Sequence, residues 1–195
     1  MSKSTKQMPG IIEGCKANRR PEQEALYKFF YADMLKLCCR YLSTDELAYE
    51  ALNTGFLKVF QNIDFYDEQK GELGAWIHTI MMHACIDLAR KEARFNNVAN
   101  TNDVIDEAFV EPAVLEKLYV DDVLLAIRTL PASTQLVFNL AVIEGYSHYD
   151  IGEQLNISES TSRWHLSVAK KQLRELLQPS NNQLNKPTEK SNKAT

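Results

Sequence analysis

Five polar side chains recur every three or four residues near the C-terminal end of the chain. They are Ser160, Arg163, Ser167, Lys170 and Arg174, and on a helix this spacing places them on one side. Arginine can bridge two acceptors on the edge of a guanine, and lysine and serine can hold phosphate oxygens. The pattern therefore indicates a helix side that fits the major groove of a nucleic acid duplex. The plainer interpretation, solvated residues on an amphipathic helix, stays open on the pattern alone.

The sequence around this side predicts how it is held. Apolar residues with spacings of 3, 4 and 3 mark a second side that is expected to pack against preceding helices: Leu166, Ala169, Leu173 and Leu176. A helix over 159–177 follows one over 149–155 after a turn of only three residues. Asn156 tolerates a left-handed conformation there, and Ser158 can cap the second helix. We therefore predict a helix-turn-helix.

Apolar stripes predict helices through the rest of the chain, and no alternating strand pattern is present. In the N-terminal part, one stripe runs from Leu26 to Tyr41 after Pro21. A second follows a cap at Ser43 or Thr44 and continues to Ile63, and a third covers 76–88. In the C-terminal part, a predicted helix over 123–130 ends before Pro131, and the next helix runs to Gly145. The fold class is all-α.

The charge distribution predicts two small domains. The net charge is -4, and residues 96–122 hold seven acids against one lysine. This polar stretch is expected to be an acidic, flexible linker that also contains the start of the next domain. It would join a helical bundle over 1–95 to the helix-turn-helix domain over 123–178. The polar tail over 179–195 is expected to be disordered.

The same residues exclude several classes of protein. The four cysteines form no CxxC pair, and His78 and His83 are five apart, so they lie on different faces of a helix. No metal site or cofactor is expected. Without a visible nucleophile and base set or a phosphate-binding loop, no enzyme is expected either. The absence of a long apolar run predicts a cytoplasmic protein that does not insert into a membrane.

Two stretches resemble one known family, the extracytoplasmic-function (ECF) sigma factors of bacterial RNA polymerase. The segment "LPASTQLVFNLAVIEGYSHYDIGEQLNISESTSRWHLSVAKKQLREL" is similar to the region that reads the -35 promoter element. The segments "EALNTGFLKVFQNIDFYD" and "GELGAWIHTIMMHACIDLARKEAR" are similar to the region that grips the polymerase and opens the -10 element. The resemblance implies an alternative sigma factor, which lends promoter selectivity to the polymerase and has no catalytic residues of its own.

The resemblance also implies roles for particular residues. Candidates for -35 contacts are Ser160, Thr161, Arg163, Trp164, His165, Ser167, Lys170 and Lys171. Candidates for -10 contacts are Trp76, His83, Arg90 and Lys91. Candidates for binding core polymerase are Glu50, Asn53 and Phe56. Trp76 has an alternative as a core residue, because a tryptophan on a helix face in a small domain is as often buried as it is a stacking platform.

The chain departs from the family pattern at a few positions. Thr54 replaces an acid in the polymerase-binding stretch, Thr79 and Met82 stand where basic residues are frequent, and His83 stands where asparagine is usual. Fewer cations predict weaker attraction to the opened DNA strand. We therefore consider a factor that melts promoters weakly alone, or that another DNA-bound protein positions.

The partners implied by the resemblance are the clamp and flap regions of core RNA polymerase and promoter DNA, with an anti-sigma factor or another DNA-targeting protein as further candidates. The rival interpretation is an autonomous helix-turn-helix regulator. Such regulators commonly dimerise so that two recognition helices match two half-sites. No extra dimerisation helix is visible in this sequence.

Overall fold

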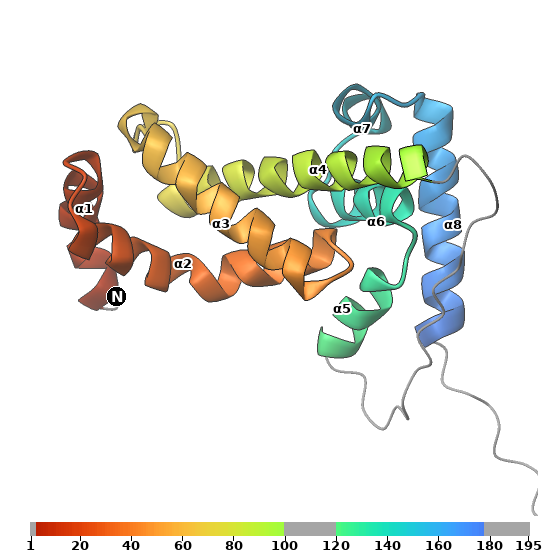
Figure 1. Cartoon of the computed structure of the whole chain (residues 1–195), viewed down its shortest axis with the longest axis horizontal. Coiled ribbons are helices and arrows are strands. Elements are labelled where there is room, and N and C mark those ends of the chain that lie inside the picture. Colours follow the sequence, from red (N-terminus) through yellow and green to blue (C-terminus); the bar gives the residue numbers. More distant parts are fainter. Residues whose placement is uncertain (1–2, 100–119, 178–195) are drawn as a thin grey trace, which may run out of the picture.

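The computed structural model describes the backbone of residues 3–99 and 120–177 and the side chains of 8–92 and 123–177. Within these ranges the protein is helical throughout, without a strand, as the sequence predicts (Figure 1). Residues 100–119 of the predicted flexible linker and the tail over 179–195, for which disorder is predicted, lie outside the described residues, as does Gln178.

The N-terminal half contains four α-helices and a short 3₁₀ turn. They are α1 (Lys3–Lys16), α2 (Arg20–Tyr41), α3 (Asp45–Asn62), η1 (Ile63–Phe65) and α4 (Leu73–Ala99). The predicted stripe is buried on α2, and it meets Leu52, Phe56 and Val59 of α3 and Ile77 and Met81 of α4. The core of this half therefore lies between the three long helices.

Local chemistry fixes the start of α3. Thr44 has extended backbone angles, and its Oγ1 accepts a hydrogen bond from the Leu47 amide at 3.3 Å. Asp45 and Glu46 follow in the first turn, where carboxylates interact favourably with the helix dipole. Thr44, rather than Ser43, is the cap.

The structure adds a helix that the sequence did not predict. Helix α1 contains Pro9 and packs against α2 with Cys15 buried. The close approach depends on Gly14, where an added Cβ would lie 2.2 Å from Cγ of Glu22. Pro9 argues against a helix here, because proline removes a backbone donor and its ring clashes with the preceding turn in a helix interior.

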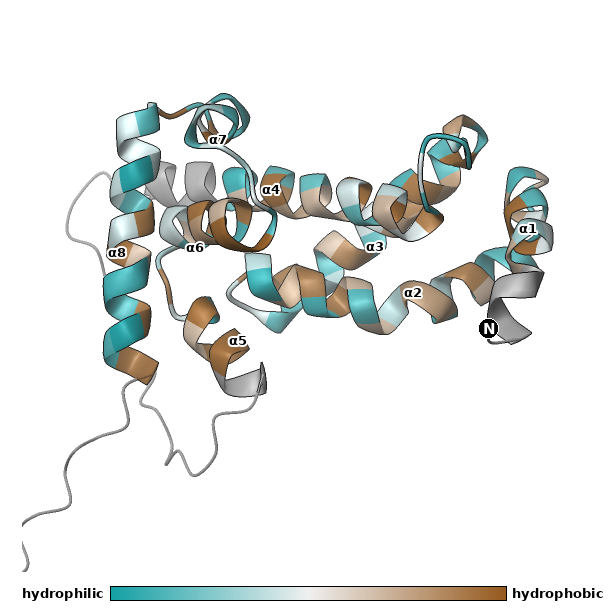
Figure 2. Cartoon of the chain, turned by 180° about the vertical axis from the view of Figure 1, so that it is seen from behind, coloured by the Kyte–Doolittle hydropathy of each residue, from teal (hydrophilic) through white to brown (hydrophobic). Residues whose placement is uncertain are grey.

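The C-terminal half contains α5 (Val120–Arg128), α6 (Ala132–Phe138), a π-helical turn η2 (Asn139–Ile143), α7 (His148–Leu155) and α8 (Glu159–Leu177). Pro131 precedes α6, and Gly145 ends the predicted 131–145 helix with a φ of 76°. A small core forms where α8 packs against α5, and its buried members are Ala126, Ile127, Leu130, Ala169 and Leu173. Figure 2 shows these apolar sides turned toward one another.

The predicted linker is shorter at its N-terminal end, because α4 continues through residues 96–99. Helix α5 begins at Val120, within the stretch that was predicted to contain the start of the next domain. The asparagines and the alanine of residues 96–99 are typical of a linker, but a helix that has already formed can continue through them at a small cost in free energy.

The two halves are packed against each other rather than separate. Helix α2 contacts both α5 and α6, and α4 contacts α6. The apolar cluster of the N-terminal half continues into Leu136, Val137 and Leu140 of the C-terminal half. In Figure 1 the C-terminal half correspondingly lies against the end of the N-terminal bundle.

Candidate nucleic-acid interface

Helix α8 is held in place by its inner side. Ser162 is fully buried, and its hydroxyl shares a hydrogen bond of 2.8 Å with Nδ1 of His148 at the start of α7. One turn further on, Nδ1 of His165 lies 2.9 Å from Oγ1 of Thr134 in α6. With Ala169 buried as well, three contacts along one side orient the helix.

The turn between α7 and α8 has the predicted geometry. Asn156 has a φ of 55° and a ψ of 49°, which is the left-handed conformation, and Ser158 Oγ accepts from the Thr161 amide at 3.1 Å. Gly152 of α7 is required by close packing, because a Cβ there would lie 2.8 Å from the backbone oxygen of Ile157. The helix-turn-helix is thus confirmed down to its cap.

The predicted polar side of α8 is exposed. Its five members, Ser160, Arg163, Ser167, Lys170 and Arg174, all face solvent, as does Lys171. Arg163 forms an ion pair with Glu159 one turn earlier. Among the described residues, no acid lies within 4.0 Å of Lys170, Lys171 or Arg174. Within the described ranges this side therefore presents three cations without an acidic neighbour, which suit phosphate, and one arginine that is paired with an acid.

Three neighbouring residues have roles that differ from the predicted ones. His165 is only partly exposed, burial lowers the pKa of its imidazole, and its contact with Thr134 links α8 to α6. The Thr161 hydroxyl lies 2.8 Å from that of Ser158 and belongs to the helix cap. Leu176, predicted to pack inward, is 38% exposed. Trp164, at 60% exposure, remains available to a ligand.

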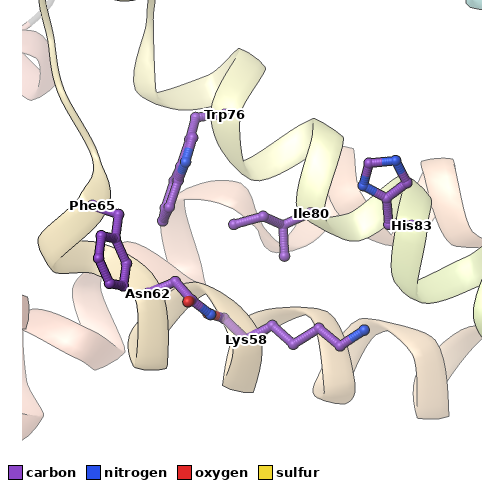
Figure 3. Close-up of a pocket in the computed structure, with 6 residues that line it drawn as sticks. All are labelled: Lys58, Asn62, Phe65, Trp76, Ile80 and His83. Carbon is purple, nitrogen blue, oxygen red and sulfur yellow. The ribbon is translucent and has the colours of Figure 1, made fainter.

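A pocket of about 380 Å³ lies between α3 and α4 on the N-terminal half. Its lining consists of Lys58, Asn62, Phe65, Trp76, Ile80 and His83. Figure 3 shows the Phe65 and Trp76 rings at one end, Ile80 at the centre and His83 at the other end, with the Lys58 side chain running beneath. Aromatic faces, an amide and a cation are groups that bind an unstacked nucleobase and its phosphate.

The loop between α3 and α4 builds the aromatic end of this pocket. Tyr66 donates its hydroxyl hydrogen to the Gly71 carbonyl at 3.1 Å, and its ring contacts Trp76 with centroids 5.6 Å apart. Phe65 precedes it and is 79% exposed. Trp76 therefore combines both interpretations offered by the sequence, since it packs against the core and lines the pocket.

The predicted -10 residues do not all lie together. Trp76 and His83 line the pocket, whereas Arg90 and Lys91 lie further along α4. The amine of Lys91 is 3.9 Å from Glu50, so the structure pairs a predicted DNA residue with a predicted polymerase residue. Sequence reasoning missed Lys58, Asn62 and Phe65. The signal that marks Phe65 is a bulky aromatic at the end of a helix, outside the apolar stripe.

The residues of α3 that were predicted to bind polymerase fall into an exposed group and a buried one. Glu50 and Asn53 face solvent, and Leu57, which the sequence analysis did not select, is 56% exposed on the same side of the helix. Phe56 is only 2% exposed and packs against Tyr27 with ring centroids 4.5 Å apart. The prediction that Phe56 contacts polymerase directly is therefore wrong in this conformation: its side chain fills the core beneath the exposed side.

One departure from the family pattern has a structural cause. Met82 is 2% exposed and belongs to the core, so a basic residue could not be accommodated at this position without disturbing the packing. Thr79 is exposed, and its hydroxyl donates to the Ala75 carbonyl at 3.0 Å. Of these two positions, only that of Thr79 could have carried an exposed basic residue.

Within the described ranges, no group of three or more metal-ligating side chains comes together. Nor does any helix in that part of the chain have the length and apolar character needed to span a membrane.

Comparisons with known proteins match both halves of the chain. A model of sigma-70 region 2 matches residues 26–95, and a model of sigma-70 region 4 matches residues 121–173. The chain is 29% identical over 127 residues to "ECF RNA polymerase sigma factor SigE" of Mycolicibacterium smegmatis, a match that covers 63% of the chain but about half (48%) of that protein. It is 26% identical over 175 residues to "ECF RNA polymerase sigma factor SigL" of Mycobacterium tuberculosis, covering 86% of the chain and 95% of that protein.

Solved structures that the chain matches include the sigma factor RpoE in complex with the anti-sigma factor NepR from Bartonella quintana. It shares 20% identity and a TM-score of 0.49 over 80% of this chain and 97% of that one. CnrH in complex with the cytosolic domain of CnrY shares 14% identity and a TM-score of 0.44 over 86% of this chain and 94% of that one.

A helix-turn-helix half and a helical half that each match a sigma-70 region define a sigma factor. The chain belongs to the sigma-70 family and, within it, to the ECF sigma factors, which are alternative factors for transcription initiation.

Proposed function

We propose that this chain binds core RNA polymerase in the cytoplasm and directs it to promoters through two DNA surfaces. Helix α8 reads the -35 duplex, and the pocket between α3 and α4 holds an unpaired base of the -10 element. The observation that carries the proposal is the presence of both surfaces in one sigma-70 chain: an exposed basic helix side and an open pocket with two aromatic rings.

The roles at the -35 surface follow from exposure and pairing. Arg163 lies near the start of α8, the part of a recognition helix that reaches base edges. Ser160, Ser167, Lys170 and Lys171 supply phosphate contacts. His165 is a positioning residue in this scheme, since its ring nitrogen is engaged with Thr134.

The -10 pocket acts on an opened strand because its contents suit a base that has left the duplex. A base leaving the stack loses its neighbours, and an aromatic side chain replaces part of that stacking energy. Phe65 is the most exposed large apolar residue described, so a stacked base would also cover a side chain that otherwise remains in water. Lys58 lines the pocket, and its amine forms an ion pair with Asp87 at 3.0 Å. In the complex the amine exchanges this carboxylate for a phosphate of the strand.

Polymerase binding is assigned to the exposed side of α3. Glu50, Asn53 and Leu57 follow helical spacing there and offer a carboxylate, an amide and an apolar group. Phe56 supports this side from within. No catalytic residue is assigned, because the polymerase performs the chemistry.

The test replaces the stacking platform. Phe65→Ala should weaken binding of the assembled holoenzyme to a single-stranded -10 oligonucleotide by about 5- to 150-fold, equivalent to roughly 1–3 kcal/mol per stacked base. Fluorescence anisotropy measures this affinity, and helix content by circular dichroism should be unchanged because Phe65 is exposed. Phe29→Ala, which removes an exposed ring on α2, is the matched control. Equal affinities for both variants and the parent protein would contradict the assignment.

A further inference from the structure

Trp164 is a large apolar side chain within the polar, exposed side of α8. It lies in the second turn of this helix, and 60% of it is exposed. The exposed residues that share its side at helical spacing are polar or charged: Ser160, Ser167 and Lys171. Trp76, by contrast, packs against the apolar cluster of the N-terminal half. Most of the Trp164 indole is therefore left in water, where a ligand that covers it gains hydrophobic free energy.

The position of Trp164 is the part of α8 that reaches base edges. Among the described elements, α8 forms the outer edge of the molecule in both views (Figures 1 and 2). Side chains on a helix lean toward its N-terminal end, so the indole covers the first turn, beside Ser160. A recognition helix contacts bases with its N-terminal residues. Trp164 therefore lies among base-reading positions, whereas Lys170 and Lys171 follow further along.

A neighbouring ring holds the indole in place. The ring centroids of Trp164 and His165 are 4.8 Å apart and the ring planes meet at 68°, an edge-to-face contact. Nδ1 of His165 lies in turn 2.9 Å from Oγ1 of Thr134 in α6. Helix α6 thus fixes the imidazole, and the imidazole limits rotation of the indole. A side chain that is ordered before binding loses less conformational entropy in the complex.

The chemistry of the indole limits what it can recognise. Tryptophan has one N–H donor, no acceptor and no charge, so it cannot bridge the two acceptors of a guanine as Arg163 can. The apolar group that base edges present in the major groove is the C5 methyl group of thymine. Contact between this methyl group and the face of the indole removes both from water.

We infer that Trp164 is a specificity-determining residue of the -35 surface, which selects a thymine by packing its indole against the C5 methyl group. The inference rests on the proposed function, because it requires α8 to lie in the major groove of the -35 duplex. Arg163 and Trp164 are consecutive and therefore lie about 100° apart around the helix, so they contact different bases. The preferred -35 element contains a thymine whose methyl group contributes to affinity independently of Arg163.

The experiment removes one methyl group from the DNA. The assembled holoenzyme first selects its preferred sequence from duplexes randomised only in the -35 element. Each thymine of that sequence is then replaced by deoxyuridine, which pairs identically and lacks only the C5 methyl group. At one thymine the replacement should weaken binding of the parent holoenzyme by about fourfold, equivalent to about 0.8 kcal/mol for one buried carbon group. Competition binding measures the ratio of the two affinities.

Variants of Trp164 assign this ratio to the indole. Trp164→Ala should bind the thymine and deoxyuridine duplexes equally, and Trp164→Phe, which keeps an aromatic face, should restore part of the ratio. Leu176→Ala is the matched control, because it removes exposed apolar surface near the other end of α8 and should leave the ratio unchanged. Arg163→Ala should lower the affinity for both duplexes and keep the ratio, since it removes a contact with a different base.

Several outcomes would overturn the inference. One is a selected -35 sequence without thymine, and another is a parent affinity that changes at no thymine. A ratio that survives in Trp164→Ala would assign the methyl group to another side chain and the indole to the DNA backbone or to a protein.

Failure of the proposed function gives a different result. In that case the holoenzyme selects no -35 sequence, and neither Arg163→Ala nor Lys170→Ala changes its affinity for the duplex. Selection that depends on Arg163 but on no methyl group removes only the role of Trp164.

Discussion

At the scale of single residues, Arg163 has two alternative partners, an acid of its own helix and a DNA base. In the free protein it pairs with Glu159, and in a promoter complex its guanidinium would donate to a guanine. Because the pair with Glu159 is exposed, it is weak and is readily exchanged. Arg163 is therefore the residue at which sequence discrimination can be tested most directly.

Arg163→Ala should reduce selection of the preferred -35 sequence by roughly 1–3 kcal/mol, because the variant loses a bidentate base contact. Competition binding by the holoenzyme between promoters that differ only in the -35 element measures this. Lys170→Ala is the comparison: it should weaken binding about equally on all sequences and reduce its dependence on salt. A uniform loss for Arg163→Ala as well would assign that side chain to phosphate.

His165 should make stability depend on pH. Burial lowers the pKa of the folded imidazole, whereas the unfolded imidazole keeps its ordinary value of about 6.5. The unfolded state therefore binds more protons, and the contribution of His165 is present above about pH 6.5 and is lost as the pH falls through that value toward the lower folded pKa. The unfolding free energy of the parent protein, measured relative to His165→Gln by urea titration, should decrease from about pH 7.5 to 5. A constant difference would contradict this origin.

The ends of individual helices could be predicted from the sequence where one or two capping or turn residues determine them. Thr44 caps α3, Asn156 takes the left-handed conformation and Ser158 caps α8, and each rule depends on one or two side chains. Helix α1 and the π-helical turn were missed. Pro9 argues against a helix at α1, whose packing also depends on Gly14 meeting α2, which is a tertiary contact.

Gly152 lies where two helices meet through a backbone contact, and a larger side chain would not fit there. An added methyl group would meet the backbone of the turn, which cannot move without shifting α8, so Gly152→Ala should lower the free energy of unfolding by about 1–3 kcal/mol. Gly10→Ala is the control, because nothing lies within 4 Å of its new Cβ and alanine favours a helix by up to about 1 kcal/mol. Thermal melts of both variants measure the contrast, and a stabilised Gly152→Ala would contradict the packing argument.

For the whole molecule, charge balance limits what the factor does alone. Residues 1–95 hold 13 basic and 13 acidic residues, and two lysines near the -10 surface, Lys58 and Lys91, already lie beside acids. The sequence predicted the helix-turn-helix with its exposed polar side and two of the residues that line the pocket, Trp76 and His83. It did not predict the docking of the two halves, because the buried amides of Gln135 and Asn139 look like ordinary polar positions until a partner helix covers them.

This balance predicts weak promoter opening. Transcription by purified polymerase with this factor should be about tenfold or more higher on a template with a pre-opened -10 bubble than on closed duplex, because few unneutralised cations are available to attract the separated strand. Run-off transcription on the two templates, matched in sequence, measures the ratio. Equal yields would show that the factor opens promoters without assistance and would remove the case for a second DNA-bound protein.

The chain contains two tryptophans, and the fold gives one to each proposed DNA surface: Trp76 lines the pocket and Trp164 is exposed on α8. Indole emission responds to stacking and to loss of surrounding water, so the protein carries a natural optical reporter at each of the two proposed surfaces. Replacing one indole with phenylalanine leaves a single emitter, whose stopped-flow signal would reveal whether duplex recognition or strand capture occurs first.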